Sequence, residues 1–279
     1  MYSAVKSSTP TLTHFIPSQG GRGVSAVTSL GDDVFVVRDN SQQVEVYDAE
    51  TLTLQRHIAV HGLCYPTGLV ACPNNNCLYA SGWNDSNIHR VELSGSNAVK
   101  KWSVVGSPRG LSVNIAHNLV VACRGANKLQ EYTTRGSLVR EICLQSSLTK
   151  LTNPWHAIQL STGDYVVSHN TSPGVVSVVG VDGQVIHSYV HSQTSDVGVM
   201  KYPTSLAVTK NDDILVADQC NNRILSINRS TGCVQDLALS VDDGIRYPFD
   251  LCLDESRSRL YVGEVGGQHR VLVFDGVRL

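Results

Sequence analysis

Imidazole and carboxylate side chains in the second half of the chain are the residues best suited to metal chemistry. The candidates are His156, His169, Asp218, Asp250 and Glu264. Imidazole together with carboxylate suits zinc or another divalent cation. If the fold brings these residues together, they predict a metal-dependent lyase or hydrolase.

Two of these acids also have a structural interpretation. Asp218 and Glu264 each end an apolar run and precede an arginine, Arg223 and Arg270 respectively. A carboxylate in that position can accept hydrogen bonds from backbone N–H groups or from the arginine. This interpretation needs no metal and leaves the chain without a catalytic centre.

A second set of residues suits binding rather than catalysis. Arginine, tryptophan and tyrosine dominate the energetics of protein interfaces. The same side chains suit single-stranded RNA, whose bases stack on aromatic rings while arginine pairs with phosphate. The binding candidates are Arg38, Trp83, Arg109, Arg124, Trp155, His156, His169 and Phe249.

Other catalytic signals are weak. The chain has no Gly-x-Ser-x-Gly motif, and its glycine-rich segment at 20–23 precedes a predicted strand instead of a helix. A Cys123 nucleophile with His169 is conceivable, although Cys123 ends an apolar run and is more simply a core residue. The eight cysteines include no Cys-x-x-Cys pair. We therefore expect no cofactor and favour a protein that is not an enzyme.

A sequence repeat must position all of these residues. Five units open at a proline, at positions 66, 108, 154, 203 and 248, and a sixth opens at Gly23. Each unit contains short β-branched and aliphatic runs separated by turn residues, which predicts four strands per unit. A repeat of forty-odd residues with four strands is typical of a β-propeller. The sequence predicts an all-β, six-bladed propeller of four-stranded antiparallel blades, forming one domain over 1–279.

The ends of the chain predict how the ring closes. The last unit lacks a recognisable fourth strand, whereas a spare strand at about 11–17 precedes the first unit. If this N-terminal strand completes the last blade, two exposed strand edges disappear. We expect its removal to destabilise the ring.

The same geometry predicts a functional rim. The start of each inner strand and the end of each second strand should lie on one face of the ring. Residues 1–140 contain twelve Lys and Arg against nine Asp and Glu, or +3, and residues 141–279 contain ten against fifteen, or −5. The early units therefore bring arginines to this top rim, and the late units bring acids.

The two C-terminal units resemble the NHL repeat. The resemblance rests on Pro203 to Gly232, with its Ile-Leu-Val-Ala-Asp strand followed by Asn-Asn-Arg-Ile, and on Pro248 to Gly276; it extends more weakly over residues 20–279. It implies a module like the C-terminal propeller of tripartite-motif ubiquitin ligases, which binds RNA or proteins on one face. The metal-holding six-bladed lyases and hydrolases are also similar in architecture.

Composition limits the choice of partners. The net charge is −2 and 16% of residues are charged, so no global field attracts nucleic acid or acidic membranes. No apolar run is long enough to span a membrane, and no hydrophobic signal core opens the chain. We expect a cytoplasmic monomer that binds a protein or RNA at its top rim. The alternative is the metal-dependent enzyme.

Overall fold

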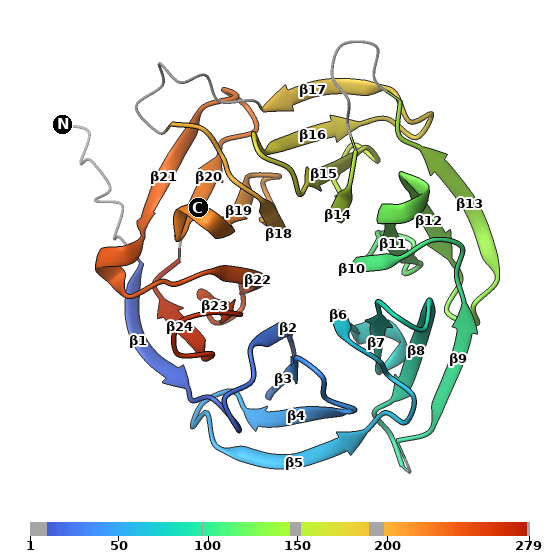
Figure 1. Cartoon of the computed structure of the whole chain (residues 1–279), viewed down its shortest axis with the longest axis vertical. Helices are drawn as coiled ribbons and strands as arrows, with labels where there is room; N and C mark the ends of the chain where they lie inside the picture. Colours follow the sequence, from blue (N-terminus) through green and yellow to red (C-terminus); the bar gives the residue numbers. More distant parts are fainter. Residues whose placement is uncertain (1–9, 96, 146–151, 190–197, 278–279) are drawn as a thin grey trace.

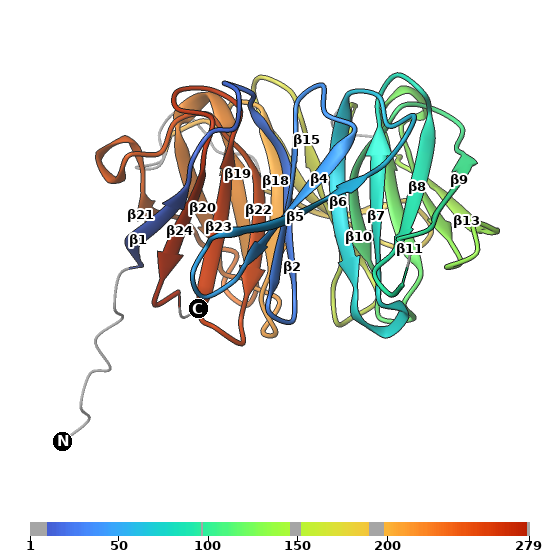
Figure 2. The same cartoon turned by 90° about the horizontal axis from the view of Figure 1, so that it is seen from below.

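A computed structural model describes residues 10–95, 97–145, 152–189 and 198–277. Within these ranges the chain forms six four-stranded antiparallel sheets arranged as the blades of a propeller (Figure 1). This confirms the fold predicted from the repeat. The molecule is a thick disc in side view (Figure 2). No helix in the described segments is long and apolar enough to cross a membrane.

Each blade is built in the same order, from the channel outward. The inner strands are β2 (Val24–Leu30), β6 (Pro66–Cys72), β10 (Pro108–Val113), β14 (Pro154–Gln159), β18 (Pro203–Val208) and β22 (Pro248–Asp254). The second strands are β3 (Asp33–Arg38), β7 (Cys77–Gly82), β11 (Leu119–Cys123), β15 (Tyr165–His169), β19 (Ile214–Asp218) and β23 (Arg259–Glu264).

The outer half of each blade completes the sheet. The third strands are β4 (Gln43–Asp48), β8 (Asn87–Glu92), β12 (Lys128–Tyr132), β16 (Val175–Val179), β20 (Arg223–Ile227) and β24 (Val271–Asp275). The outermost strands are β5 (Leu54–Ala59), β9 (Val99–Ser103), β13 (Leu138–Cys143), β17 (Val185–Tyr189), β21 (Val234–Leu239) and β1 (Thr11–Ile16). Short 3-10 turns are η1 (Pro73–Asn75), η2 (Arg124–Ala126), η3 (Gln219–Asn221) and η4 (Val241–Asp243).

The N-terminal strand closes the ring as expected. β1 pairs with β24 from Thr11↔Asp275 to Ile16↔Val271, so the two ends of the described chain share the last blade (Figure 1). Only Ile16 of β1 is buried. Its side chain joins the apolar cluster between the sixth and first blades.

The core is divided into six apolar clusters, each between two neighbouring blades. Because both faces of a blade are covered, the second strands consist almost wholly of buried residues, as in Ile214–Asp218. This division explains the repeat in the sequence. Most apolar positions are there to pack one blade on the next, and they leave the strand ends free to vary.

Candidate binding site at the channel mouth

The rim predicted from the repeat is present. The first residue of each inner strand pairs with the last residue of the second strand, as in Pro108↔Cys123 and Pro154↔His169. In the first blade the pairing is Val24↔Arg38, so Val24 and not Gly23 takes the place of the proline.

A β-bulge follows the first residue of every inner strand. Bulges re-aim side chains and are common beside functional sites. The residue directly after the opening one differs from blade to blade. Around the ring it is Ser25, Thr67, Arg109, Trp155, Thr204 and Phe249. Three of the six blades therefore place a large side chain at the channel mouth.

Arg109 is the centre of this group. Its guanidinium carbon lies 4.7 Å from the ring centre of Trp83 and 4.7 Å from that of Trp155. The residue is only 4% exposed, and its Nε has no hydrogen-bond partner among the described residues. Burial, with the nearby charge of Arg124, lowers the pKa of Arg109 to about 10. A buried guanidinium without an acid is costly unless a ligand supplies one.

Aromatic rings extend the group on both sides. Tyr65 meets Trp83 edge to face at 6.3 Å, and Trp155 meets Phe249 in the same manner at 5.6 Å. Arg124 lies 5.9 Å from the Trp155 ring and donates from Nε to Asn153 Oδ1. We call these residues the rim cluster: Tyr65, Trp83, Arg109, Arg124, Trp155 and Phe249.

Tyr65 is held out by a strained backbone. Its φ is +49°, in the left-handed region that bulky residues rarely adopt, and the side chain is 46% exposed. Tyr202 and Tyr247 precede their inner strands in the same conformation and are 41% and 47% exposed. Each of the three rings is therefore partly exposed beside the start of its inner strand. Strain of this kind collects at functional sites.

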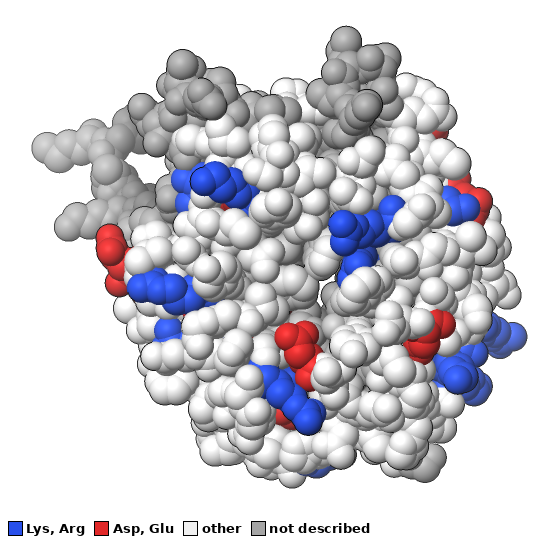
Figure 3. Space-filling model, viewed as in Figure 1, with Lys and Arg blue, Asp and Glu red and all other residues white. Residues whose placement is uncertain are grey.

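The charge of the rim cluster is not compensated within the described residues. Arg223 pairs with Asp218 and Arg270 pairs with Glu264, whereas neither Arg109 nor Arg124 makes a described ion pair. Figure 3 shows Lys and Arg atoms on one side of the central opening and Asp and Glu atoms on another. The mouth of the channel thus combines unpaired positive charge with exposed aromatic surface.

Arg38 does not take part in this surface. It is 1% exposed and donates from Nε to both carboxylate oxygens of Glu45 at 2.9 Å. Its other nitrogens donate to the carbonyl oxygens of Pro17 at 2.9 Å and His269 at 2.8 Å. Arg38 therefore joins the first blade to the closing segment, and we withdraw it from the binding candidates.

His156 is buried inside the ring. Leu206 N–H donates to its Nδ1 at 3.0 Å, so Nε2 carries the proton and donates to the carbonyl oxygen of Leu111 at 3.0 Å. A side chain on Gly110 would begin 2.6 Å from the imidazole, which explains glycine there. His156 joins three blades and has no nitrogen left for a metal or a partner.

Three of the remaining metal candidates also form hydrogen bonds with other groups of the protein. His169 is 1% exposed, with Nε2 2.9 Å from Ser177 Oγ. Asp218 accepts from Lys201 N–H and from Arg223, and Glu264 accepts from Arg246 N–H and from Arg270. Among the described residues no group of three His, Cys, Asp or Glu could hold a metal ion. The structural interpretation of the two strand-end acids thus fits their contacts.

Asp250 faces a small cavity of about 90 Å³ in the channel, together with His156. It accepts from Val27 N–H at 2.7 Å, and burial raises its pKa to about 6.

Cys123, the nucleophile candidate, is also buried: its thiol donates to Gln130 Oε1, and burial raises the pKa of the thiol to about 12. A thiol of this kind is a poor nucleophile at neutral pH.

The neutral state of His156 predicts a pH dependence of stability. Burial lowers its pKa from 6.5 to about 4. Between these values the unfolded chain binds a proton that the folded protein does not, so acidification favours unfolding. A shift of this size corresponds to about 3 kcal/mol. Asp250 acts in the opposite direction because its folded pKa is raised.

A His156→Gln variant isolates the contribution of His156 to the pH dependence of the free energy of unfolding. In urea unfolding, the stability advantage of the unmodified protein over the variant should shrink by up to about 3 kcal/mol from pH 7 to pH 4. An advantage that stays constant over this range would contradict the assignment of a neutral, buried imidazole.

The fold and the rim together define the class of protein: a six-bladed β-propeller with one polarised rim. The NHL repeat model matches residues 200–225, which cover β18 and β19. The match and the blade count together support an NHL-type propeller. No curated protein sequence matches the chain.

Solved structures share the architecture at low sequence identity. A streptogramin B lyase is 11% identical, with a TM-score of 0.68 over 94% of this chain and 96% of that one. A virginiamycin B lyase from Staphylococcus aureus, with quinupristin, is 12% identical, with a TM-score of 0.67 over 92% and 82%. Hydrazine synthase of Kuenenia stuttgartiensis is 19% identical, with a TM-score of 0.65 over 92% and 78%. Such identities show the fold alone.

Proposed function

We propose that this propeller is a protein-binding module whose rim cluster receives a carboxylate of its partner. The observation that carries the proposal is the buried guanidinium of Arg109, held between two tryptophans without an acid among the described residues. A guanidinium presents its N–H donors as a flat fork, and here two rings each lie 4.7 Å from its carbon. A planar carboxylate suits that fork.

The surroundings favour a protein over RNA. RNA binding without base readout needs a basic groove that follows many phosphates. The rim cluster contains two cations without a described ion pair, Arg109 and Arg124, on a chain of net charge −2. Tyr65 and Trp83 are exposed beside a buried arginine, and these three residue types are enriched at the hot spots of protein–protein interfaces. The NHL-type fold is consistent with such a module, as is the resemblance to tripartite-motif propellers.

Binding is also favoured over catalysis. Both nitrogens of His156 bind the protein's own backbone, and the strand-end acids are paired with arginines. Among the described residues that line the channel cavity, Asp250 has a pKa of about 6, raised by burial. The resemblance to lyases is one of fold and supplies no catalytic set for this chain.

Parallel selections test the class of partner. A random peptide library and a random single-stranded RNA library are selected against the unmodified protein and against Arg124→Gln, with Lys201→Gln as a control elsewhere on the rim. We expect peptides enriched in Asp, Glu or a free C-terminus, with enrichment lost only in Arg124→Gln. Enrichment of RNA that depends on Arg124 would assign the rim to RNA instead.

A further inference from the structure

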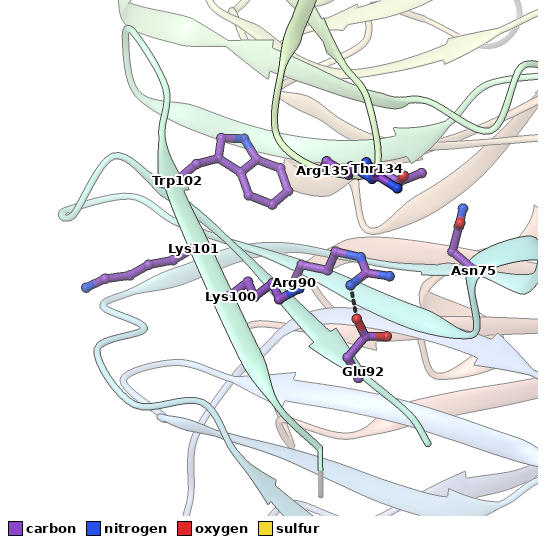
Figure 4. Close-up of a pocket in the computed structure, with 8 residues that line it drawn as sticks. All are labelled: Asn75, Arg90, Glu92, Lys100, Lys101, Trp102, Thr134 and Arg135. Carbon is purple, nitrogen blue, oxygen red and sulfur yellow. Dashed lines mark hydrogen bonds and ion pairs between the residues drawn. The ribbon is translucent and has the colours of Figure 1, made fainter. Parts of the chain in front are cut away.

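A second basic pocket lies on the side of the disc, away from the channel mouth. It has a volume of about 850 Å³ and opens between the outer strands of the second blade and the β12–β13 hairpin of the third (Figure 4). Volumes of this size are typical of small-molecule sites. The pocket is lined by Asn75, Arg90, Glu92, Lys100, Lys101, Trp102, Thr134 and Arg135.

The sheet register places like charges together in this pocket. Arg90 on β8 is the direct partner of Lys100 on β9, so both side chains project from the same face of the blade. Like charges opposite each other destabilise a sheet. Lys101 and, from the neighbouring blade, Arg135 bring the cations that line the pocket to four (Figure 4). The repulsion would be relieved by an anion bound among them.

The positive charge of the pocket exceeds the charge of its one acidic lining residue, Glu92. Glu92 pairs with Arg90, and no described acid pairs with Lys100 or Arg135. The excess of positive charge is therefore local, because the whole chain has a net charge of −2.

The indole ring of Trp102 forms one wall of the pocket. Its ring packs against Tyr79 at 6.1 Å and Tyr132 at 6.2 Å. Its indole Nε1 is buried and has no partner within the described chain. The packed indole ring is therefore fixed in place, and its N–H signal can report on binding in the pocket.

We propose that this lateral pocket binds a small ligand carrying several phosphate groups. Its four cations come from two blades, so they can contact several phosphate groups at separate points. Lysine and arginine both bind phosphate oxygens well. The site is independent of the channel mouth, because the two share no residue.

The test uses inorganic tripolyphosphate as the probe, with the full chain and its variants Lys100→Glu and Arg135→Glu. Both side chains are exposed, so the fold should persist. Titration calorimetry should show binding that weakens at least tenfold in each variant, while Lys210→Glu, an equal charge change on an exposed turn, leaves it unchanged. Binding should also weaken with added salt.

Two results would overturn the proposal. One is the absence of tripolyphosphate binding, or binding that Lys100→Glu and Lys210→Glu alter equally. The other is equally tight binding of tricarballylate, a tricarboxylate, which would show that the pocket does not select phosphate. A shift of the Trp102 indole N–H signal on adding tripolyphosphate, absent on adding tricarballylate, supports the site as drawn.

Discussion

Replacing Arg38 with methionine is expected to lower the free energy of unfolding by about 3–5 kcal/mol, the usual cost of breaking a buried ion pair. The carboxylate of Glu45 would remain buried without its cation. The carbonyl oxygens of Pro17 and His269 would also lose their donors, which weakens the junction between the closing segment and the first blade. Urea unfolding measures the loss.

Two companion variants make this result interpretable. Arg56→Met removes an exposed pair with Asp33 in the same blade, and should cost less than about 1 kcal/mol. Adding Glu45→Gln to Arg38→Met removes the orphaned charge and should recover part of the loss. If Arg38→Met costs no more than Arg56→Met, then Arg38 does not have the structural role assigned to it.

Deleting residues 1–18 should destabilise the ring by roughly 5 kcal/mol or more. Burial of Ile16 alone is worth about 2–3 kcal/mol, and the strand also supplies the hydrogen bonds of five register pairs with β24. The deletion would leave β24 as an open edge, which promotes association between chains. Thermal unfolding and light scattering measure the two effects.

A pair of substitutions separates closure from a general effect of truncation. Ile16→Asn places an amide in the cluster between the sixth and first blades, whereas Phe15→Asn changes a side chain that is 52% exposed on the same strand. We expect a large loss of stability only from Ile16→Asn. Equal effects, or a truncated chain with an unchanged melting temperature, would refute closure by this strand.

The repeat predicted the fold because blade packing dictates most apolar positions. The intervals between prolines 66, 108, 154, 203 and 248 gave the blade count, and the missing fourth strand of the last unit gave the closure. In the first blade, where glycine replaces proline, the alignment was one residue out. The register shows that Val24 takes the place of the proline.

The site was only partly predictable. Sequence position brought Trp83, Arg109, Arg124, Trp155 and Phe249 to one rim, and the structure places them in contact. Sequence position could not show which of these side chains touch, because this depends on how far each of them reaches across the mouth.

An acidic partner, and not burial, separates two arginines that otherwise look alike. Arg38 and Arg109 both stand at strand ends on this rim, and both are at most 4% exposed. Glu45, seven residues after Arg38, supplies its acid, whereas Arg109 has two tryptophan faces and no described acid. The presence of a partner from another strand cannot be read from residue type alone. It is this difference that makes Arg109 a binding candidate and Arg38 a structural residue.

The most direct test of the rim cluster is a titration of the protein with an acetylated triglutamate peptide, followed by NMR of the indole N–H signals. We predict that the signals of Trp83 and Trp155 shift, that the shifts disappear in Arg109→Gln, and that the triglutamine peptide of the same shape produces none. Absence of any shift with triglutamate, or the same shift in Arg109→Gln, would contradict a carboxylate site at the channel mouth.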